Sequence, residues 1–311
     1  MPRILVTGGA GFIGSSLADT LAKDKENDIV VVDDLTTGSH SKVPRSKNKN
    51  VEFIKCDVND WRDISGVMYA RAFDYIFHYA AVVGVKRTLD HPVNVLQDLS
   101  GIKNLLMFAK NTGVKRVYFS SSSEVYGESI HFPQNEETTP LNSRLPYAIV
   151  KNACEAYLKS YQHEYGLEYT IFRFFNTYGP KQSKDFVVSK FIARALKNEP
   201  IQVYGDGKQM RTFCYIDDNV DATVASFKKN LFINDVVNIG GDIEITILDL
   251  AKTIIKLTKS KSKIVHLPPL KEGDMTRRKP DLERMNKLLN RKPIKLEDGL
   301  MRIIKNTTHI L

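Results

Sequence analysis

Cysteine is scarce in this 311-residue chain, and long apolar runs are absent from it. The three cysteines, Cys56, Cys154 and Cys214, are widely separated and form no Cys-x-x-Cys pair. Isolated cysteines in odd number favour reduced thiols over a structural zinc site, so we expect no metal. Apolar stretches such as 29–32 are too short to cross a bilayer, and no leader pattern precedes the first strand. We therefore expect a soluble, cytoplasmic protein without a membrane partner.

The charge balance is basic, with 45 Lys and Arg against 36 Asp and Glu and a net charge of +9. The lysines are scattered, with short clusters only at 42–49 and 256–263, and no aromatic residues alternate with them as in RNA-binding sheets. We therefore expect no nucleic-acid partner. A positive field of this kind equally favours an anionic small-molecule substrate.

Short apolar strands alternate with helical patterns over the first half of the chain. The expected strands cover 3–7, 29–33, 51–56, 75–78, 117–120 and 169–174, and the expected helices cover 12–23, 60–70, 92–111 and 147–164. Alternation of this kind predicts a doubly wound parallel sheet with right-handed crossovers. The fold class is therefore α/β and Rossmann-like.

This alternation changes after Phe175. A loop at 176–184 leads to an expected helix at 186–197 and to short strands at 201–204 and 212–215. Residues 235–239 have the pattern of a buried strand that returns to the sheet. We expect a first domain over 1–175, with that returning strand near 235–240, and a smaller, partly interleaved α/β substrate domain over 176–311.

A glycine-rich turn, Gly8-x-x-Gly11-x-x-Gly14, joins the first expected strand to the first expected helix, which begins at Phe12 and Ile13. Glycines at such a turn let the backbone approach a pyrophosphate, and the helix N-terminus attracts the anion. The pattern therefore predicts a dinucleotide site.

Acidic residues follow two neighbouring strands. Asp33 ends the second strand, where a carboxylate can bind the ribose hydroxyls of adenosine. Because a 2'-phosphate would meet both Asp33 and Asp34, this position favours NAD over NADP. After the third strand, Asp57 and Val58 are candidate adenine contacts, although Asp57 is equally typical of a solvated turn.

The segment Tyr147-Ala-Ile-Val-Lys151 places a phenol and an ammonium on one face of a helix. A free tyrosine has a pKa of about 10, and a neighbouring cation lowers that pKa by favouring the phenolate. Tyr147 is therefore a candidate general base. A run of serines, Ser120 to Ser123, ends the fifth expected strand, where ligands bind in such sheets, and is followed by Glu124.

Seven segments occur in an order that resembles the extended short-chain dehydrogenases acting on nucleotide sugars, namely the 4-epimerases, 4,6-dehydratases and decarboxylases. The resemblance covers essentially the whole chain and rests on the glycine turn, Asp33, His78-Tyr-Ala-Ala81, the serine run with Val-Tyr-Gly127, Tyr147-x-x-x-Lys151, Arg173-Phe-Phe-Asn-Thr-Tyr-Gly-Pro180 and Tyr204-Gly-Asp-Gly-Lys-Gln-Met-Arg211. It implies an NAD-dependent enzyme with a tightly bound cofactor and a nucleotide-diphosphate sugar as substrate.

The resemblance also implies roles for individual residues. Ser122, Tyr147 and Lys151 match the catalytic trio. Tyr147 and Lys151 also match cofactor contacts, as do Ala80 and Ala81. Asn176 and Arg211 match contacts to the diphosphate, and Arg87 is a further candidate for substrate binding. The expected helices at 92–111 and 147–164 correspond to a four-helix bundle that joins two subunits, so we expect a homodimer.

By resemblance, the reaction begins with oxidation of the sugar at C4' to a 4-keto species. Dehydratases have Asp-Glu before Val-Tyr-Gly; here Ser123 and Glu124 stand there, and serine is too weak an acid to assist loss of water. Ser-Glu and the Arg-Lys-Pro-Asp segment containing Arg278 resemble decarboxylases of UDP-glucuronate. This resemblance makes Arg278 a further candidate for substrate binding. The segment from His78 to Pro92 resembles epimerases instead.

We therefore expect 4-epimerisation first and decarboxylation second. A net 4-dehydrogenase with a second electron acceptor stays open, because it needs the same trio. A non-catalytic NAD-sensing scaffold is the rival from another class, and the intact trio argues against it.

Overall fold

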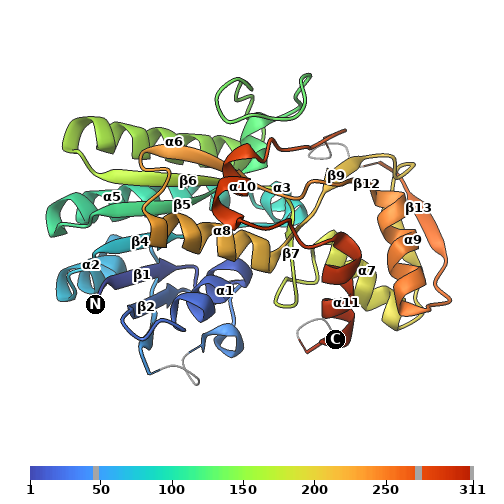
Figure 1. Ribbon diagram of the computed structural model, residues 1–311, viewed down its shortest axis with the longest axis horizontal. Coiled ribbons are helices and arrows are strands. Elements are labelled where there is room, and N and C mark those ends of the chain that lie inside the picture. The colour runs from blue at the N-terminus through green and yellow to red at the C-terminus, as the bar shows by residue number, and fades with distance from the viewer. Residues whose placement is uncertain (45–48, 270–274, 309–311) are drawn as a thin grey trace. The chain divides into compact units, whose positions relative to one another are not determined.

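The computed structural model describes residues 1–44, 49–269 and 275–308 (Figure 1). They form two compact units: 1–125, 143–173 and 223–237 make up the first, and 126–142, 174–222 and 238–311 the second. Against the expected boundary near residue 175, the segment 126–142 groups with the second unit, while 223–237 returns to the first.

The first unit is built on a sheet of seven strands in the order β11-β6-β5-β4-β1-β2-β3. Every pairing among β1 to β5 is parallel, which confirms the expected Rossmann-like fold. The returning strand β11 lies at the edge beside β6, as the sequence predicted. The strands are β1 (Arg3–Thr7), β2 (Asp28–Asp33), β3 (Val51–Lys55), β4 (Tyr75–His78), β5 (Arg116–Ser122), β6 (Glu168–Phe174) and β11 (Asp235–Ile239).

Helices connect these strands. They are α1 (Phe12–Leu21), α2 (Trp61–Ala70), α3 (Val85–Asp90), α4 (Pro92–Leu96), α5 (Asp98–Thr112) and α6 (Pro146–Tyr165), with α8 (Ile216–Lys229) leading back to β11. Left-handed glycines, Gly113 and Gly166, end α5 and α6. The helix expected over 92–111 is present in two parts, α4 and α5, which meet at Gln97, although the backbone of Gln97 itself has α-helical angles (φ −64°, ψ −25°).

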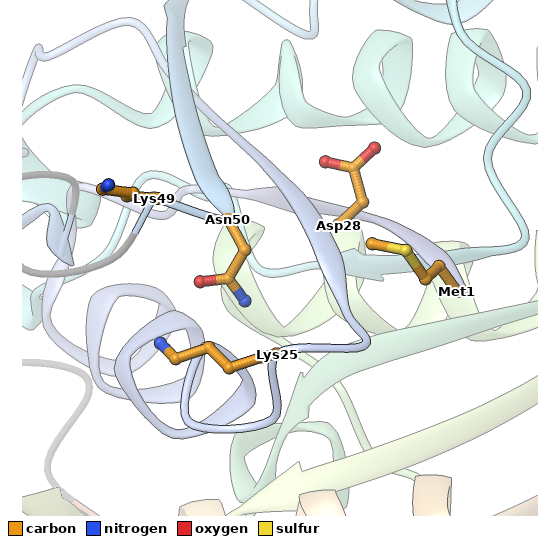
Figure 2. Close-up of a pocket in the computed structure, with 5 residues that line it drawn as sticks. All are labelled: Met1, Lys25, Asp28, Lys49 and Asn50. Atoms are coloured by element: carbon orange, nitrogen blue, oxygen red, sulfur yellow. The ribbon is translucent and has the colours of Figure 1, made fainter.

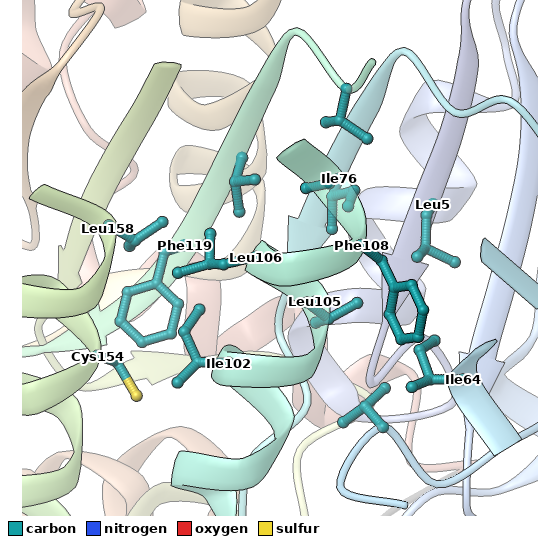
Figure 3. Close-up of a cluster of buried hydrophobic side chains, with 14 of the residues drawn as sticks. Leu5, Ile64, Ile76, Ile102, Leu105, Leu106, Phe108, Phe119, Cys154 and Leu158 are labelled. Atoms are coloured by element: carbon teal, nitrogen blue, oxygen red, sulfur yellow. The ribbon is translucent and has the colours of Figure 1, made fainter. Parts of the chain in front are cut away.

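Apolar side chains of α2, α5, α6 and the sheet form one continuous core (Figure 3). Ile102 and Leu105 of α5 are fully buried, and Phe119 of β5 lies beside Cys154 and Leu158 of α6. Because α6 packs against both α5 and β5, the positions of residues on α6 are fixed relative to the end of that strand.

The second unit combines short strand pairs with helices. Its elements are β7 (Thr177–Tyr178), α7 (Val187–Leu196), β8 (Ile201–Tyr204), β9 (Met210–Thr212), β10 (Cys214–Tyr215), β12 (Glu244–Thr246), α9 (Ile247–Thr258), β13 (Ile264–Leu267), α10 (Glu283–Leu289) and α11 (Leu296–Lys305). The single strand expected at 212–215 is two strands, because the chain changes partners at Phe213: β9 pairs with β12, and β10 pairs with β7.

None of the helices in the described ranges is long and apolar enough to cross a membrane. Within those same ranges, no three His, Cys, Asp or Glu side chains are grouped in a way that could hold a metal ion.

Candidate active site

The glycine turn lies between β1 and α1, and its glycines are needed for steric reasons. Gly8 has a φ of +66°, and a Cβ atom there would lie 2.6 Å from the amide nitrogen of Ala80. A Cβ on Gly14 would clash with the carbonyl oxygen of Gly8, which accepts a hydrogen bond of 3.0 Å from the Gly11 amide. The turn therefore packs backbone against backbone.

The N-terminus of α1 emerges directly from this turn. Gly11 is its N-cap and contributes no side-chain cap, and Phe12 and Ile13 open the first turn. The first amides of a helix have no partners within the helix and carry its positive dipole end. Such a terminus suits the pyrophosphate of a dinucleotide.

Asp33, at the end of β2, is buried beside the turn. Its Oδ2 accepts from the Ala10 amide at 3.0 Å, and its Oδ1 accepts from the Leu35 amide at 2.9 Å. Burial raises the pKa of Asp33, while these two amides lower it. A carboxylate has about four acceptor positions, so two backbone bonds leave capacity for ribose hydroxyls. The turn and Asp33 together fit an NAD molecule.

The other candidate cofactor residues follow the neighbouring strands. Val58 is buried, and Asp57 accepts a hydrogen bond of 2.8 Å from the Asn59 amide within its own turn. Ala80 and Ala81 follow β4, and the Ala80 amide donates to Thr7 Oγ1 at 3.2 Å. These candidates therefore gather at one edge of the sheet, the carboxyl ends of β1 to β4.

The sequence interpretation did not include Thr7, which organises the loop after β4. Its Oγ1 accepts from the amides of Tyr79 and Ala80 and lies 2.8 Å from His78 Nδ1. Burial, and to a lesser extent the charge of Lys151, lowers the pKa of His78 to about 3. His78 is therefore neutral at neutral pH.

Tyr147 and Lys151 lie one turn apart on α6. Lys151 is buried, and its Nζ donates to the carbonyl oxygen of Ser120 at 2.7 Å. The ammonium lies 5.8 Å from the centre of the Tyr147 ring and 4.7 Å from that of Phe119. Burial lowers the pKa of Lys151, whereas Cys154, Asp98 and Glu155 raise it.

The serine run begins at Ser120, whose carbonyl oxygen accepts the hydrogen bond from Lys151, and continues to the end of β5. Ser122 ends the strand, and its Oγ accepts from the Glu124 amide at 3.2 Å. Ser123 is buried, and Glu124, half-buried, lies in the short helix η3 (Ser123–Tyr126). Because Lys151 is hydrogen-bonded to Ser120, which precedes Ser122 by two residues, this bond holds α6 beside the end of β5.

A buried ion pair strengthens this junction, and the sequence interpretation missed it. Glu155, one turn beyond Lys151, forms a salt bridge of 2.7 Å with Arg173 of β6. Glu155 Oε1 also accepts from Ser121 Oγ at 2.5 Å. The spacing of four residues from Lys151 was the available signal, because it places Glu155 on the same helix face.

Three candidate substrate residues gather around β9 in the second unit. Asn176 Nδ2 donates to the carbonyl oxygen of Thr212 at 2.9 Å. The carbonyl oxygen of Met210 accepts from Arg211 Nη1 at 2.9 Å and from the Arg278 amide at 3.2 Å. Both arginines are buried. Guanidinium groups this close to one strand suit an anion with several oxygens.

The fourth candidate substrate residue is Arg87. It belongs to α3 in the first unit, and its Nη1 donates to the carbonyl oxygen of Val83 at 3.1 Å. Arg87 is therefore positioned by the loop that follows Ala81.

A surface hollow at the other edge of the sheet does not belong to this site. It is lined by Met1, Lys25, Asp28, Lys49 and Asn50 (Figure 2). Asp28 begins β2, whereas Asp33 ends it. Ligands of doubly wound sheets bind at the carboxyl ends of the strands. The hollow lies at the amino end of β2 and is therefore not part of the candidate active site.

Comparison with known proteins gives a consistent picture. The model of the NAD dependent epimerase/dehydratase family matches residues 4–240. A UDP-N-acetyl-alpha-D-glucosaminuronate decarboxylase of Bacillus cytotoxicus is 36% identical over 97% of both chains. The UDP-glucose 4-epimerase of Thermotoga maritima, solved with UDP-glucose, has a TM-score of 0.91 at 33% identity over 98% of both chains. The UDP-glucose 4-epimerase of Thermus thermophilus, solved with NAD, has a TM-score of 0.90 at 28% identity, covering 99% of this chain and 98% of that one.

Proposed function

Because the chain belongs to the NAD-dependent epimerase/dehydratase family, we propose that it acts on C4' of a nucleoside-diphosphate sugar as a 4-epimerase. The observation that supports this most directly is the buried Lys151 ammonium, which is fixed to the Ser120 carbonyl beside the ring of Tyr147. That arrangement provides a base for a sugar hydroxyl at the end of β5.

Tyr147 removes the proton from the 4'-hydroxyl in the first half of the reaction. Lys151 favours the phenolate through its charge, and Ser122 can hydrogen-bond the same sugar oxygen. NAD, when bound, would supply the redox chemistry as a reversible hydride acceptor for C4'. In an epimerase the 4-keto sugar rotates in the site, so that its opposite face is reduced, and Tyr147 then gives the proton back to O4'.

The chain provides the groups that hold NAD. The turn from Gly8 to Gly14 and the start of α1 would bind the pyrophosphate, and Asp33 would bind the adenosine ribose. We propose a tightly bound cofactor, because a reaction that ends at its starting redox state leaves NAD unchanged and requires no exchange.

The arginines near β9 would bind the substrate diphosphate. Arg211 and Arg278 can each donate two parallel hydrogen bonds to phosphate oxygens, which a lysine cannot do. Asn176 would donate from its amide. Arg87, in the loop after Ala81, is a further candidate for contacts to the sugar.

Decarboxylation of a uronic acid is the second candidate. Oxidation at C4' places a ketone β to the C6 carboxylate, so carbon dioxide can leave with its electrons stabilised by the ketone. Glu124, whose amide donates to Ser122 Oγ, occupies the position after Ser123 at the end of β5. The decarboxylase from Bacillus cytotoxicus, at 36% identity over 97% of the chain, favours this outcome as well.

A substrate screen distinguishes these outcomes. The purified protein would be incubated with UDP-glucose, UDP-N-acetylglucosamine, their two uronic acids and GDP-sugars, and the products followed by mass and NMR. An isobaric product inverted at C4' supports epimerisation, and loss of carbon dioxide supports decarboxylation. Accumulation of a 4-keto sugar with NADH would instead indicate a net dehydrogenase. Absence of turnover on the whole panel would contradict the proposal.

A further inference from the structure

Two buried carboxylates influence Lys151, and their surroundings differ. The charge of Glu155 is compensated by Arg173, because its two oxygens accept hydrogen bonds from Arg173 Nε at 3.0 Å and Nη2 at 2.7 Å. Asp98, in the first turn of α5, is only 9% exposed. Its Oδ2 accepts from the Val82 amide at 2.9 Å, and the side-chain amide of Asn59 also donates to it. Within the described ranges, no cationic side chain forms a salt bridge with Asp98.

We propose that Asp98 is the counter-charge of Lys151 and acts, through Lys151, as a positioning residue for the reaction begun by Tyr147. The proposal rests on the function proposed above. Its basis is the packing of α5 against α6, which places a buried, unneutralised carboxylate in the same core as a buried ammonium held by one neutral acceptor. A buried ammonium without an anion would tend to lose its proton.

The electrostatics of the two groups agree with this assignment. Burial raises the pKa of Asp98 and lowers that of Lys151, so each group alone tends toward its neutral form. The charge of Lys151 lowers the pKa of Asp98, and the charge of Asp98 raises that of Lys151. The charge of each group therefore opposes the tendency of the other toward its neutral form.

The remaining titratable groups around Lys151 do not replace Asp98. His78 of β4 is neutral at neutral pH, since burial lowers its pKa to about 3. Cys154 of α6 is a neutral thiol, because burial raises its pKa to about 12. Asp57, after β3, acts on Asp98 and raises its pKa. Because Glu155 is paired with Arg173, Asp98 is the group among these that supplies a negative charge for Lys151.

Asp98 also connects the lysine to the loop after β4. Its bond to the Val82 amide fixes the residue directly after Ala80 and Ala81, the candidate cofactor contacts. Loss of the charge and loss of the loop contact would therefore have different consequences, and an experiment can separate them.

Asp98→Asn removes the charge and preserves the shape. Its remaining carbonyl oxygen can still accept from the Val82 amide. Its new amide can donate to Asn59 Oδ1, a buried atom without a partner among the described residues, once the Asn59 amide turns over. We therefore expect this variant to fold.

The test is the pH profile of turnover on a substrate found in the screen. Activity needs the Tyr147 phenolate and the Lys151 ammonium, which predicts a bell-shaped profile whose limbs belong to the coupled pair. Removing a nearby negative charge lowers both pKa values, so Asp98→Asn should shift both limbs to lower pH by roughly one unit. Asp90→Asn, an exposed aspartate on α3, is the matched control and should leave both limbs in place.

A spectroscopic titration provides a readout independent of turnover. The phenolate absorbance of Tyr147, obtained by subtracting the spectrum of a Tyr147→Phe protein, should appear at lower pH in the Asp98→Asn background than in the wild type. If Asp98→Asn fails to fold, Asp98→Ser gives the same neutral state with a hydroxyl for the Val82 amide.

Reduced turnover with unshifted limbs and an unshifted phenolate titration would overturn the proposal, because Asp98 would then only support the loop. Full turnover by Tyr147→Phe would overturn the proposed function itself. The two failures are therefore distinguishable.

Discussion

At the scale of single residues, Tyr147 is the group on which the proposed chemistry depends. Tyr147→Phe removes the hydroxyl and keeps the ring beside Lys151, so we expect turnover to fall by roughly 10²- to 10⁴-fold. NAD binding should persist, because the glycine turn and Asp33 are untouched. Tyr165→Phe, at the exposed end of α6, is the control and should retain activity. The measurement is steady-state turnover alongside NAD content after purification.

His78 predicts a pH dependence of stability. Its pKa is about 3 in the folded protein, against about 6.5 in the unfolded chain. Below pH 6.5 the unfolded chain therefore binds more protons, and the free energy of unfolding decreases as the pH falls toward 3. The free energy of unfolding is unaffected by protonation of His78 above pH 6.5. As the pH falls to about 3, protonation of His78 in the unfolded chain lowers this free energy by up to about 5 kcal/mol.

His78→Asn tests this contribution. Its amide can occupy the position of Nδ1 and keep the hydrogen bond to Thr7 Oγ1, but it cannot titrate. Urea unfolding between pH 7 and pH 4 should show a shallower decline in the free energy of unfolding for the variant. Equal slopes for both proteins would mean that His78 does not contribute.

At the scale of secondary-structure elements, the sequence predicted the sheet well because its strands are apolar and buried on both faces. The burial of β2 from Ile29 to Asp33 is reflected in a continuous apolar run, 29–32, which can be detected in the local sequence. The grouping of 126–142 with the second unit depends instead on contacts such as the one between Asn238 Nδ2 and the carbonyl oxygen of Gln134, 104 positions apart. No local pattern encodes such a contact.

The same distinction applies to the site. The glycine turn and the Tyr147 and Lys151 pair have fixed spacings, so the sequence indicated them. Thr7 and Asp98 act through hydrogen bonds with backbone amides far along the chain, 16 positions away in the case of Asp98 and Val82. No local sequence pattern distinguishes Thr7 or Asp98 from polar residues that have no such role.

The turn between β1 and α1 gives a prediction for an element as a whole. Gly8→Ala adds a Cβ 2.6 Å from the Ala80 amide at a φ of +66°, so the turn has to shift away from the loop after β4. We expect loss of NAD binding and of turnover. Gly66→Ala on α2, where an added Cβ meets nothing within 4 Å, is the matched control and should bind NAD normally. Normal NAD content in Gly8→Ala would contradict this account of the turn.

At the scale of the whole molecule, the exposed apolar side chains are unevenly distributed. Val93 and Leu96 on α4 are 68% and 46% exposed, and Ile149 and Tyr157 on α6 are 45% and 37% exposed. Since α4 packs against α6, these side chains belong to neighbouring helices of the first unit. Apolar groups gathered on adjacent helices mark an interaction surface more often than isolated ones do.

We propose that two copies of the chain pair through this α4 and α6 surface, as in a four-helix bundle. Burying the four side chains twice, once from each subunit, gains roughly 25 cal/mol per Å² of apolar area, whereas leaving them in water gains nothing. A symmetric contact places each residue of the patch near its own copy or near another residue of the patch. A charge introduced there therefore appears twice in the interface.

Light scattering coupled to size-exclusion chromatography at micromolar concentration should give the mass of a dimer for the wild type. Leu96→Lys combined with Ile149→Lys should give a monomer, because the interface would then bury two lysines from each subunit without partners. Ile130→Lys is the matched control: Ile130 is 85% exposed and belongs to neither α4 nor α6, so its replacement should leave the dimer intact. A monomeric wild type would contradict the pairing, and a dimeric double variant would place the interface elsewhere.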